Sequence, residues 1–151
     1  MTQKRSKKFQ PVVKLAGHRE RTSAKELGNA RNRHSANKNQ LQDLLEYRES
    51  YAALLQNKAE KGISSGDFCI YQNFLIQLDN AISQQKLALT QSSETIKQNV
   101  RGWKNHHVKQ QAMENMNKKL VHQELQADAK KEQKIADDES SQRSHLKQRL
   151  F

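Results

Sequence analysis

Cysteine and proline each occur only once in this 151-residue chain, and glycine occurs five times. A single cysteine, Cys69, excludes an internal disulfide and a zinc site built from four cysteines. It therefore indicates a reduced, cytoplasmic protein. No residue beside Cys69 would make use of a thiolate, so we expect this side chain to serve packing. Because proline and glycine are so rare, few positions are available for turns or sheet corners.

Apolar residues are also scarce: they make up 34% of the chain and aromatic residues 5%, whereas 28% of the chain is charged. The chain therefore has too few apolar residues to fill a compact core of ordinary size. No apolar run approaches the roughly 20 residues that span a bilayer. The apolar stretch that follows the basic N-terminus, at 12–16, is too short for a signal peptide. We therefore expect a cytoplasmic protein that reaches a membrane only through a partner or through charge.

An apolar residue nonetheless recurs at every seventh position in the second half of the chain. Seven residues are close to two α-helical turns, so these side chains lie along one stripe of a long helix, predicted to span residues 65–139. A lone helix cannot shield such a stripe from water, so the stripe must pack on another helix. The stripe consists of Phe68, Leu75, Ile82, Leu89, Ile96 and Trp103.

A second seam beside this stripe becomes polar in its middle. Polar residues at such positions specify the register of a coiled coil with some loss of stability. The second seam consists of Tyr71, Leu78, Gln85, Ser92, Asn99, His106, Met113 and Leu120.

The first half of the chain predicts a helix over residues 19–61, with few apolar residues at first and many later. The later part carries two apolar ridges about 100° apart on the helix surface. A two-stranded coiled coil needs only one narrow seam, so this part has surplus apolar surface. One ridge is Leu41, Leu45, Ala52 and Leu55, and the other is Leu44, Tyr47, Tyr51 and Leu54.

Three local signals predict a tight turn at residues 62–64. Gly62 suits the left-handed conformation that ends a helix. Ser64 with Asp67 resembles a capping box, and Ile63 with Phe68 stands at the two positions of a hydrophobic staple.

The predicted fold class is therefore all-α, an antiparallel two-helix coiled-coil hairpin whose second helix is the longer. Residues 1–18 are expected to form a flexible basic arm, with Pro11 at or before the start of the first helix. Residues 140–151 are expected to form a frayed tail, because the apolar pattern has dissolved there.

Most of the net charge lies near the N-terminus. Residues 1–39 hold eleven Lys or Arg and two acidic residues, a net charge of +9, whereas the other residues contribute +2. Such a segment attracts nucleic acid, anionic lipid or an acidic protein surface. The alternative is a solubilising, poorly ordered tail. The candidate contact residues are Lys4, Arg5, Lys7 and Lys8.

Sequence signals for catalysis are missing. No phosphate-binding glycine loop, nucleophile elbow or metalloprotease motif occurs. The adjacent residues His106 and His107 point about 100° apart on a helix, which is a poor arrangement for chelating one ion. We predict no catalytic residue, no metal, no cofactor and no enzymatic activity.

From about residue 40 to residue 143 the chain resembles the FliJ family, small cytoplasmic components of the bacterial flagellar type III export apparatus. Heptads alone would be weak evidence, since any coiled coil has them. The more specific features are Tyr47 and Tyr51 within 40–51, Gly-Ile-Ser at 62–64, and Tyr-Gln-x-Phe at 71–74. The sequence after residue 74 continues the resemblance to residue 82, and Asp138-Glu139 followed by Gln142-Arg143 resembles the C-terminal signature of the family.

The resemblance implies an antiparallel two-helix coiled coil similar to the central stalk of rotary ATPases. It implies that the terminal end of the hairpin enters the hexameric flagellar export ATPase and promotes ring assembly. It further implies contact with the export-gate membrane protein FlhA, the binding and recycling of export chaperones, and peripheral association with the inner membrane through the export apparatus. No small-molecule substrate is implied.

Export-gate contacts of the family carry over to positions near the turn. Gln85 departs from the pattern, because the family often has histidine there. If the stalk analogy holds, the basic N-terminal segment faces the ATPase. The implied export-gate residues are Gln40, Leu44, Tyr47, Tyr51, Phe74, Leu78, Ala81 and Gln85.

Three alternatives remain open at this stage. The chain could be the equivalent stalk component of a virulence-type secretion system. It could be a basic helical hairpin that binds nucleic acid through its N-terminal charge, with steep salt dependence. It could also be a scaffold that self-associates through its surplus apolar ridge.

Overall fold

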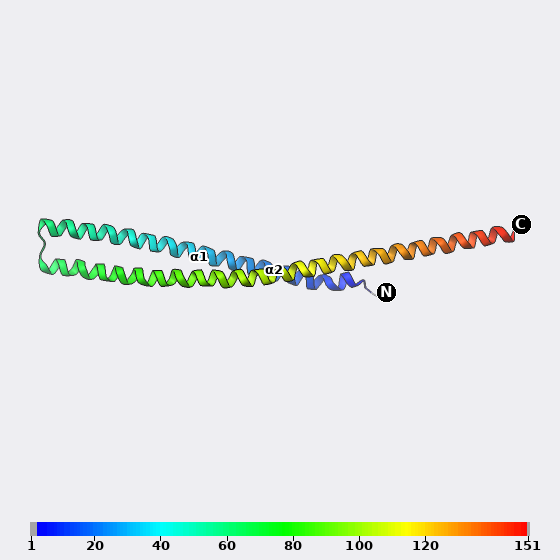
Figure 1. The fold of residues 1–151 in the computed structure, drawn as a ribbon, viewed down its shortest axis with the longest axis horizontal. Helices are drawn as coiled ribbons and strands as arrows, with labels where there is room; N and C mark the ends of the chain where they lie inside the picture. Colours follow the sequence, from blue (N-terminus) through cyan, green and yellow to red (C-terminus); the bar gives the residue numbers. More distant parts are fainter. Residues whose placement is uncertain (1–2, 151) are drawn as a thin grey trace. The chain divides into compact units, whose positions relative to one another are not determined.

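A computed structural model describes residues 3–150; residues 1, 2 and 151 of the expected arm and tail lie outside the described residues. The chain forms two α-helices, α1 (Arg5–Lys61) and α2 (Ser65–Arg149), joined by a short turn (Figure 1). The prediction of an all-α helical hairpin with a longer second helix is confirmed. The chain divides into two compact units: one is Thr22–Lys104, and the other combines Met1–Arg21 with Asn105–Phe151.

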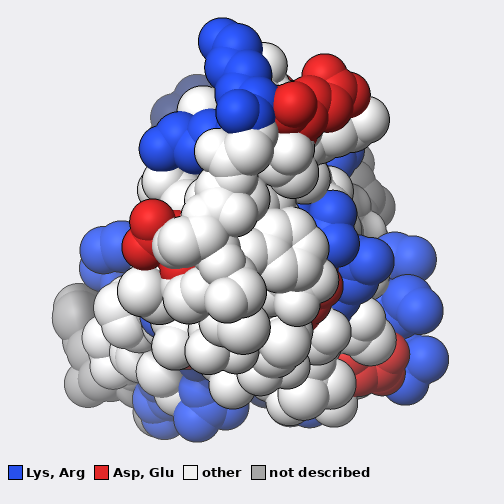
Figure 2. All heavy atoms as spheres, turned by 90° about the vertical axis from the view of Figure 1, so that its left-hand side faces the viewer, with Lys and Arg blue, Asp and Glu red and all other residues white. Residues whose placement is uncertain are grey.

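The turn contains the residues that the sequence predicted for it, Gly62 and Ser64. Gly62 has φ of 94°, a conformation that a residue with a Cβ atom adopts only with strain. The hydroxyl oxygen of Ser64 accepts a hydrogen bond from the backbone N–H of Asp67 at 3.2 Å, which caps the start of α2. Residues 62–66 carry no charge, and Figure 2, which faces the turn, shows a largely uncharged surface at its centre.

The helix boundaries differ from the expected ones. Residues 5–18, expected to be a flexible arm, are helical, and α1 continues through Pro11. Proline lacks a backbone donor and disfavours a helix interior, so local sequence argued for a later start. At the other end, α2 extends through residues 140–149, which were expected to fray.

Inward-facing positions on α1 alternate in steps of three and four residues, as in a coiled coil. In the unit 22–104, Leu27, Ala30 and Leu55 of α1 are buried, together with Leu78 and Ile82 of α2. The other members of the heptad stripe that begins at Phe68 are half-buried. A narrow seam, rather than a broad core, therefore holds the two helices together in this unit.

The two apolar ridges expected on the first helix are each divided by this geometry. Leu45, Tyr47 and Leu54 are exposed, by 38%, 53% and 44% respectively. Inward positions instead follow the steps 41, 44, 48, 51 and 55. The charged residue Arg48 occupies one step, so the apolar pattern alone did not reveal the true seam.

Two further observations concern chemistry at the surface. Cys69 is exposed, so the expected packing role is wrong. Within residues 3–150, neither helix contains a stretch that is long and apolar enough to cross a membrane.

Candidate protein-binding surfaces

Four aromatic side chains gather where α1 and α2 approach the turn. The ring of Tyr51 lies 4.6 Å from that of Phe74 and 5.5 Å from that of Tyr71, measured between centroids. Tyr47 meets Phe74 edge-on, with centroids 6.1 Å apart and planes at 85°. Contacts in this range are favourable beyond the area they bury. We call Tyr47, Tyr51, Tyr71 and Phe74 the aromatic cluster.

The cluster is partly open to solvent. The Tyr47 side chain is 53% exposed, whereas Tyr51, Tyr71 and Phe74 are half-buried. Burial raises the pKa of the Tyr51 phenol, and the neighbouring phenols of Tyr71 and Tyr47 raise it further. The cluster thus offers a partly exposed aromatic surface whose most exposed member is Tyr47.

Lys58 contacts the aromatic cluster through Tyr71. Its ammonium group donates a hydrogen bond to the Tyr71 hydroxyl oxygen at 2.6 Å and lies 4.9 Å from the centroid of the Tyr71 ring. The hydrogen bond to Tyr71 is the main cause that raises the pKa of Lys58. A cation above an aromatic face is favourable, so Lys58 orders this edge of the surface.

The expected export-gate residues do not form one uniform surface. Leu78 is 7% exposed and belongs to the core. The Gln85 amide donates a hydrogen bond to the backbone oxygen of Asn37 at 3.0 Å, so it joins the two helices. Gln40 and Tyr47 are exposed, and the remaining members, Leu44, Tyr51, Phe74 and Ala81, are half-buried.

Arg48 and Asp79 form an ion pair between the helices next to the cluster. The second guanidinium contact, from Nη2 of Arg48 to Oδ2 of Asp79, measures 3.3 Å. The hydrogen bond from Arg48 lowers the pKa of Asp79. Both side chains are at least 40% exposed, so the pair fixes geometry more than it adds stability.

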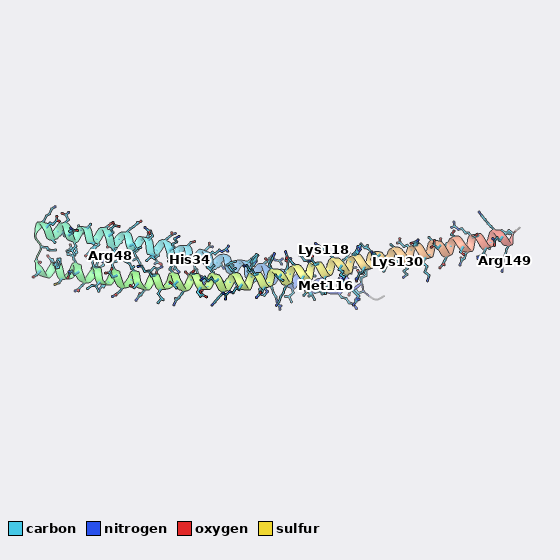
Figure 3. All side chains as sticks on the ribbon, viewed as in Figure 1. His34, Arg48, Met116, Lys118, Lys130 and Arg149 are labelled. Carbon is cyan, nitrogen blue, oxygen red and sulfur yellow. The ribbon has the colours of Figure 1, made fainter. Side chains whose placement is uncertain are left out.

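Polar side chains pair across the α1–α2 seam, a feature that the apolar pattern of α1 did not reveal. Nδ1 of His34 lies 2.9 Å from the Ser92 hydroxyl oxygen, whose own proton goes to the carbonyl of Leu89. His34 lies on the side of α1 next to α2 (Figure 3).

The basic N-terminal segment is docked onto α2 in the unit that contains it. Nζ of Lys4 lies 2.8 Å from a carboxylate oxygen of Asp128, and this contact raises the pKa of Lys4. The exposed residues Arg5, Lys7 and Lys8 follow on the first turn of α1. The segment therefore presents its charge from a helix, in contrast to the flexible arm expected from the sequence.

A groove lies between the first turns of α1 and the facing part of α2, with a volume of about 490 Å³. We call its apolar lining residues the floor and its basic lining residues the rim. The lining residues are Arg5, Lys8, Phe9, Met116, Lys119, Leu120 and Gln123.

Histidine and carboxylate groups do not assemble a metal site: among residues 3–150, no group of three or more potential ligands lies close enough together to hold an ion. His107 instead lies 3.6 Å from a carboxylate oxygen of Glu20 across the seam.

Comparison with known proteins identifies a relationship over nearly the whole chain. The family model described as "Flagellar FliJ protein" matches residues 5–149. A curated protein with the same description, from Salmonella typhi, is 28% identical over 125 residues, which cover 83% of this chain and 84% of that protein. No solved structure matches.

Proposed function

Because the chain belongs to the FliJ family of flagellar proteins, we propose that it acts in the flagellar type III export apparatus by binding and coupling other components. In this proposal it promotes ring assembly of the export ATPase, links the ring to the export gate, and escorts export chaperones. It works at the cytoplasmic side of the inner membrane, where it is held by its partners.

The observation that carries the export-gate part is the aromatic cluster. Tyr47 is the most exposed aromatic ring of the cluster, and its edge-on contact with Phe74 keeps it in place. Large aromatic side chains that are held before binding lose little entropy on binding and are frequent anchors of interfaces. We infer that Tyr47 and Gln40 contact the export gate directly, while Leu78 and Gln85 support the surface from inside.

The docked basic segment supports the ATPase part. Arg5, Lys7 and Lys8 project from a helix that Asp128 and Glu124 hold against α2. Charges presented from a fixed helix can match acidic positions on a ring more specifically than charges on a flexible arm. Their contribution should weaken as salt concentration rises.

ATP hydrolysis by the cognate export ATPase, measured while the full chain is titrated in, tests the coupling function. We expect stimulation together with ring formation, and less of both when Arg5, Lys7 and Lys8 are all changed to glutamine. A flat titration with an active ATPase and a helical chain would overturn the ring proposal.

Binding to the cytoplasmic domain of the gate protein FlhA tests the second part. Tyr47→Ala should weaken binding by about tenfold or more, as for an interface anchor. Ile76→Ala is the matched control, because Ile76 is 57% exposed and outside the cluster. Equal affinity of the two variants would contradict an anchoring role for Tyr47.

A further inference from the structure

The groove at the N-terminal end of α1 combines two chemistries that are separate elsewhere on a charged helical surface. Its floor is formed by Phe9 of α1 with Met116 and Leu120 of α2. Met116 is 53% exposed, and the other two are half-buried. An apolar floor of this kind gains free energy when a ligand covers it.

The rim of the groove is entirely basic or neutral. Arg5, Lys8 and Lys119 contribute three cations, and Gln123 is the remaining polar lining residue. In the part of the chain that the structure describes, no carboxylate lies within ion-pair distance of these three cations. Lys4, by contrast, forms an ion pair with Asp128. The rim therefore holds three cations that form no ion pair with the described residues, and the neighbouring Glu124 carboxylate is bound by Ser6.

Hydrogen bonds also fix the first turn of α1 next to the groove. Ser6, between Arg5 and the groove residue Lys8, donates two hydrogen bonds to Glu124 of α2, at 2.9 Å and 2.6 Å. These bonds anchor the first turn of α1 beside the groove, so a ligand need not organise the site on binding.

We propose that this groove binds an acidic amphipathic helix of another protein. One bulky apolar side chain of that helix covers the floor formed by Phe9, Met116 and Leu120, and flanking carboxylates face Arg5, Lys8 and Lys119. Charge complementarity selects this occupant, because an apolar floor with a basic rim needs a ligand that is both apolar and acidic. A nucleic acid would satisfy the rim through its phosphates and would not require the floor.

This inference concerns only the local chemistry of the groove, so it does not depend on the proposed ring or gate contacts. The test uses the full chain and a fluorescently labelled helical peptide of Glu, Ala and Leu, with its leucines on one face. A second peptide has the same composition in scrambled order. Fluorescence anisotropy should show tighter binding of the amphipathic peptide by about tenfold.

Four variants divide the contribution of the floor from that of the rim. Met116→Gln and Lys119→Glu alter the groove, whereas Val121→Gln and Lys118→Glu make the same kinds of change on exposed positions of α2 that do not line it. Met116 and Lys118 are about 200° apart around the helix, and both are marked in Figure 3. The first two variants should each weaken binding by about tenfold, and the controls should leave it within about twofold.

Three results would overturn the proposal, provided that circular dichroism shows all variants to be helical. If the scrambled peptide binds as tightly, or if Lys118→Glu costs as much as Lys119→Glu, the attraction is a diffuse charge effect. The third result is competition by an RNA oligonucleotide that displaces the peptide. If Met116→Gln changes neither the affinity for RNA nor the affinity for the peptide, the surface is a general polyanion site.

Discussion

Glu124 of α2 accepts two hydrogen bonds from Ser6 of α1, one from the backbone N–H at 2.9 Å and one from the hydroxyl at 2.6 Å. The N–H groups in the first turn of a helix have no partner within that helix. The first turn of α1 contains no acidic residue of its own. Glu124 therefore supplies from the neighbouring helix the cap and the negative charge that the start of α1 lacks.

Removing the Glu124 carboxylate should loosen the first turns of α1. In Glu124→Gln, we expect faster hydrogen exchange of the backbone amides of residues 6–9, because a neutral acceptor binds the Ser6 N–H less strongly. Glu114→Gln is the matched control, since Glu114 lies exposed on α2 and accepts a hydrogen bond from Gln110 of the same helix. The same exchange rate in both variants would show that Glu124 does not cap α1.

The same contact should make the start of α1 sensitive to acid. The hydrogen bonds from Ser6 are the main cause that lowers the pKa of Glu124. A carboxyl group whose pKa is lowered by folding contributes stability that is fully present above its ordinary pKa and is lost as pH falls through the lowered value. Carboxyl-carbon NMR should show the Glu124 pKa rising in Ser6→Ala. An unchanged pKa would contradict the assigned cause.

The Arg48–Asp79 pair should affect titration more than stability. Arg48→Gln should raise the pKa of Asp79 toward its ordinary value, because the hydrogen bond from Arg48 is the main cause of its lowering. Since both side chains are well exposed, the midpoint of thermal unfolding should change little at neutral pH. NMR titration and a melting curve on the same variant measure both effects. A large loss of stability with an unmoved pKa would contradict this account.

Alanine should have opposite effects at two glycines. Gly62→Ala should destabilise the hairpin by about 1 kcal/mol, because φ of 94° strains any residue with a Cβ atom. Gly28→Ala should stabilise it by about 0.5–1 kcal/mol, because Gly28 lies within α1 and a Cβ atom there meets no atom within 4 Å. Chemical denaturation measures both, and two changes of the same sign would contradict the assigned backbone roles.

Truncation should also distinguish the seam from the outer face of α2. Leu78→Ala should cost about 2–3 kcal/mol, because Leu78 is 7% exposed and its loss leaves a cavity. Leu87→Ala should change the free energy of unfolding by no more than about 0.5 kcal/mol, because Leu87 is 59% exposed. Equal costs would mean that the helices pack in another register.

The sequence by itself determined the helical hairpin and its turn. Heptad spacing from Phe68 to Trp103 places one stripe of α2 inward. Gly62 adopts the positive φ that the turn requires, and Ser64 caps the start of α2. These signals are local, since helical periodicity and backbone conformation depend on residues close together in the chain. Tyr47 and Tyr51 could likewise be identified as a family feature before their contacts were known.

Only the tertiary structure decided where α1 begins and which groups face one another. Three seam positions of α1 are occupied by the polar residues Ser6, Glu20 and His34. Ser6 lies before residue 19, where the apolar pattern predicted no helix, whereas Glu20 and His34 lie inside the predicted helix. Their partners are Glu124, His107 and Ser92. Each pair joins residues far apart in the sequence, and the hydrogen bonds of Ser6 and His34 satisfy polar groups at the seam. The packing of α1 on α2 likewise placed Leu78 and Gln85 inside, left Tyr47 outside, and formed the basic-rimmed groove.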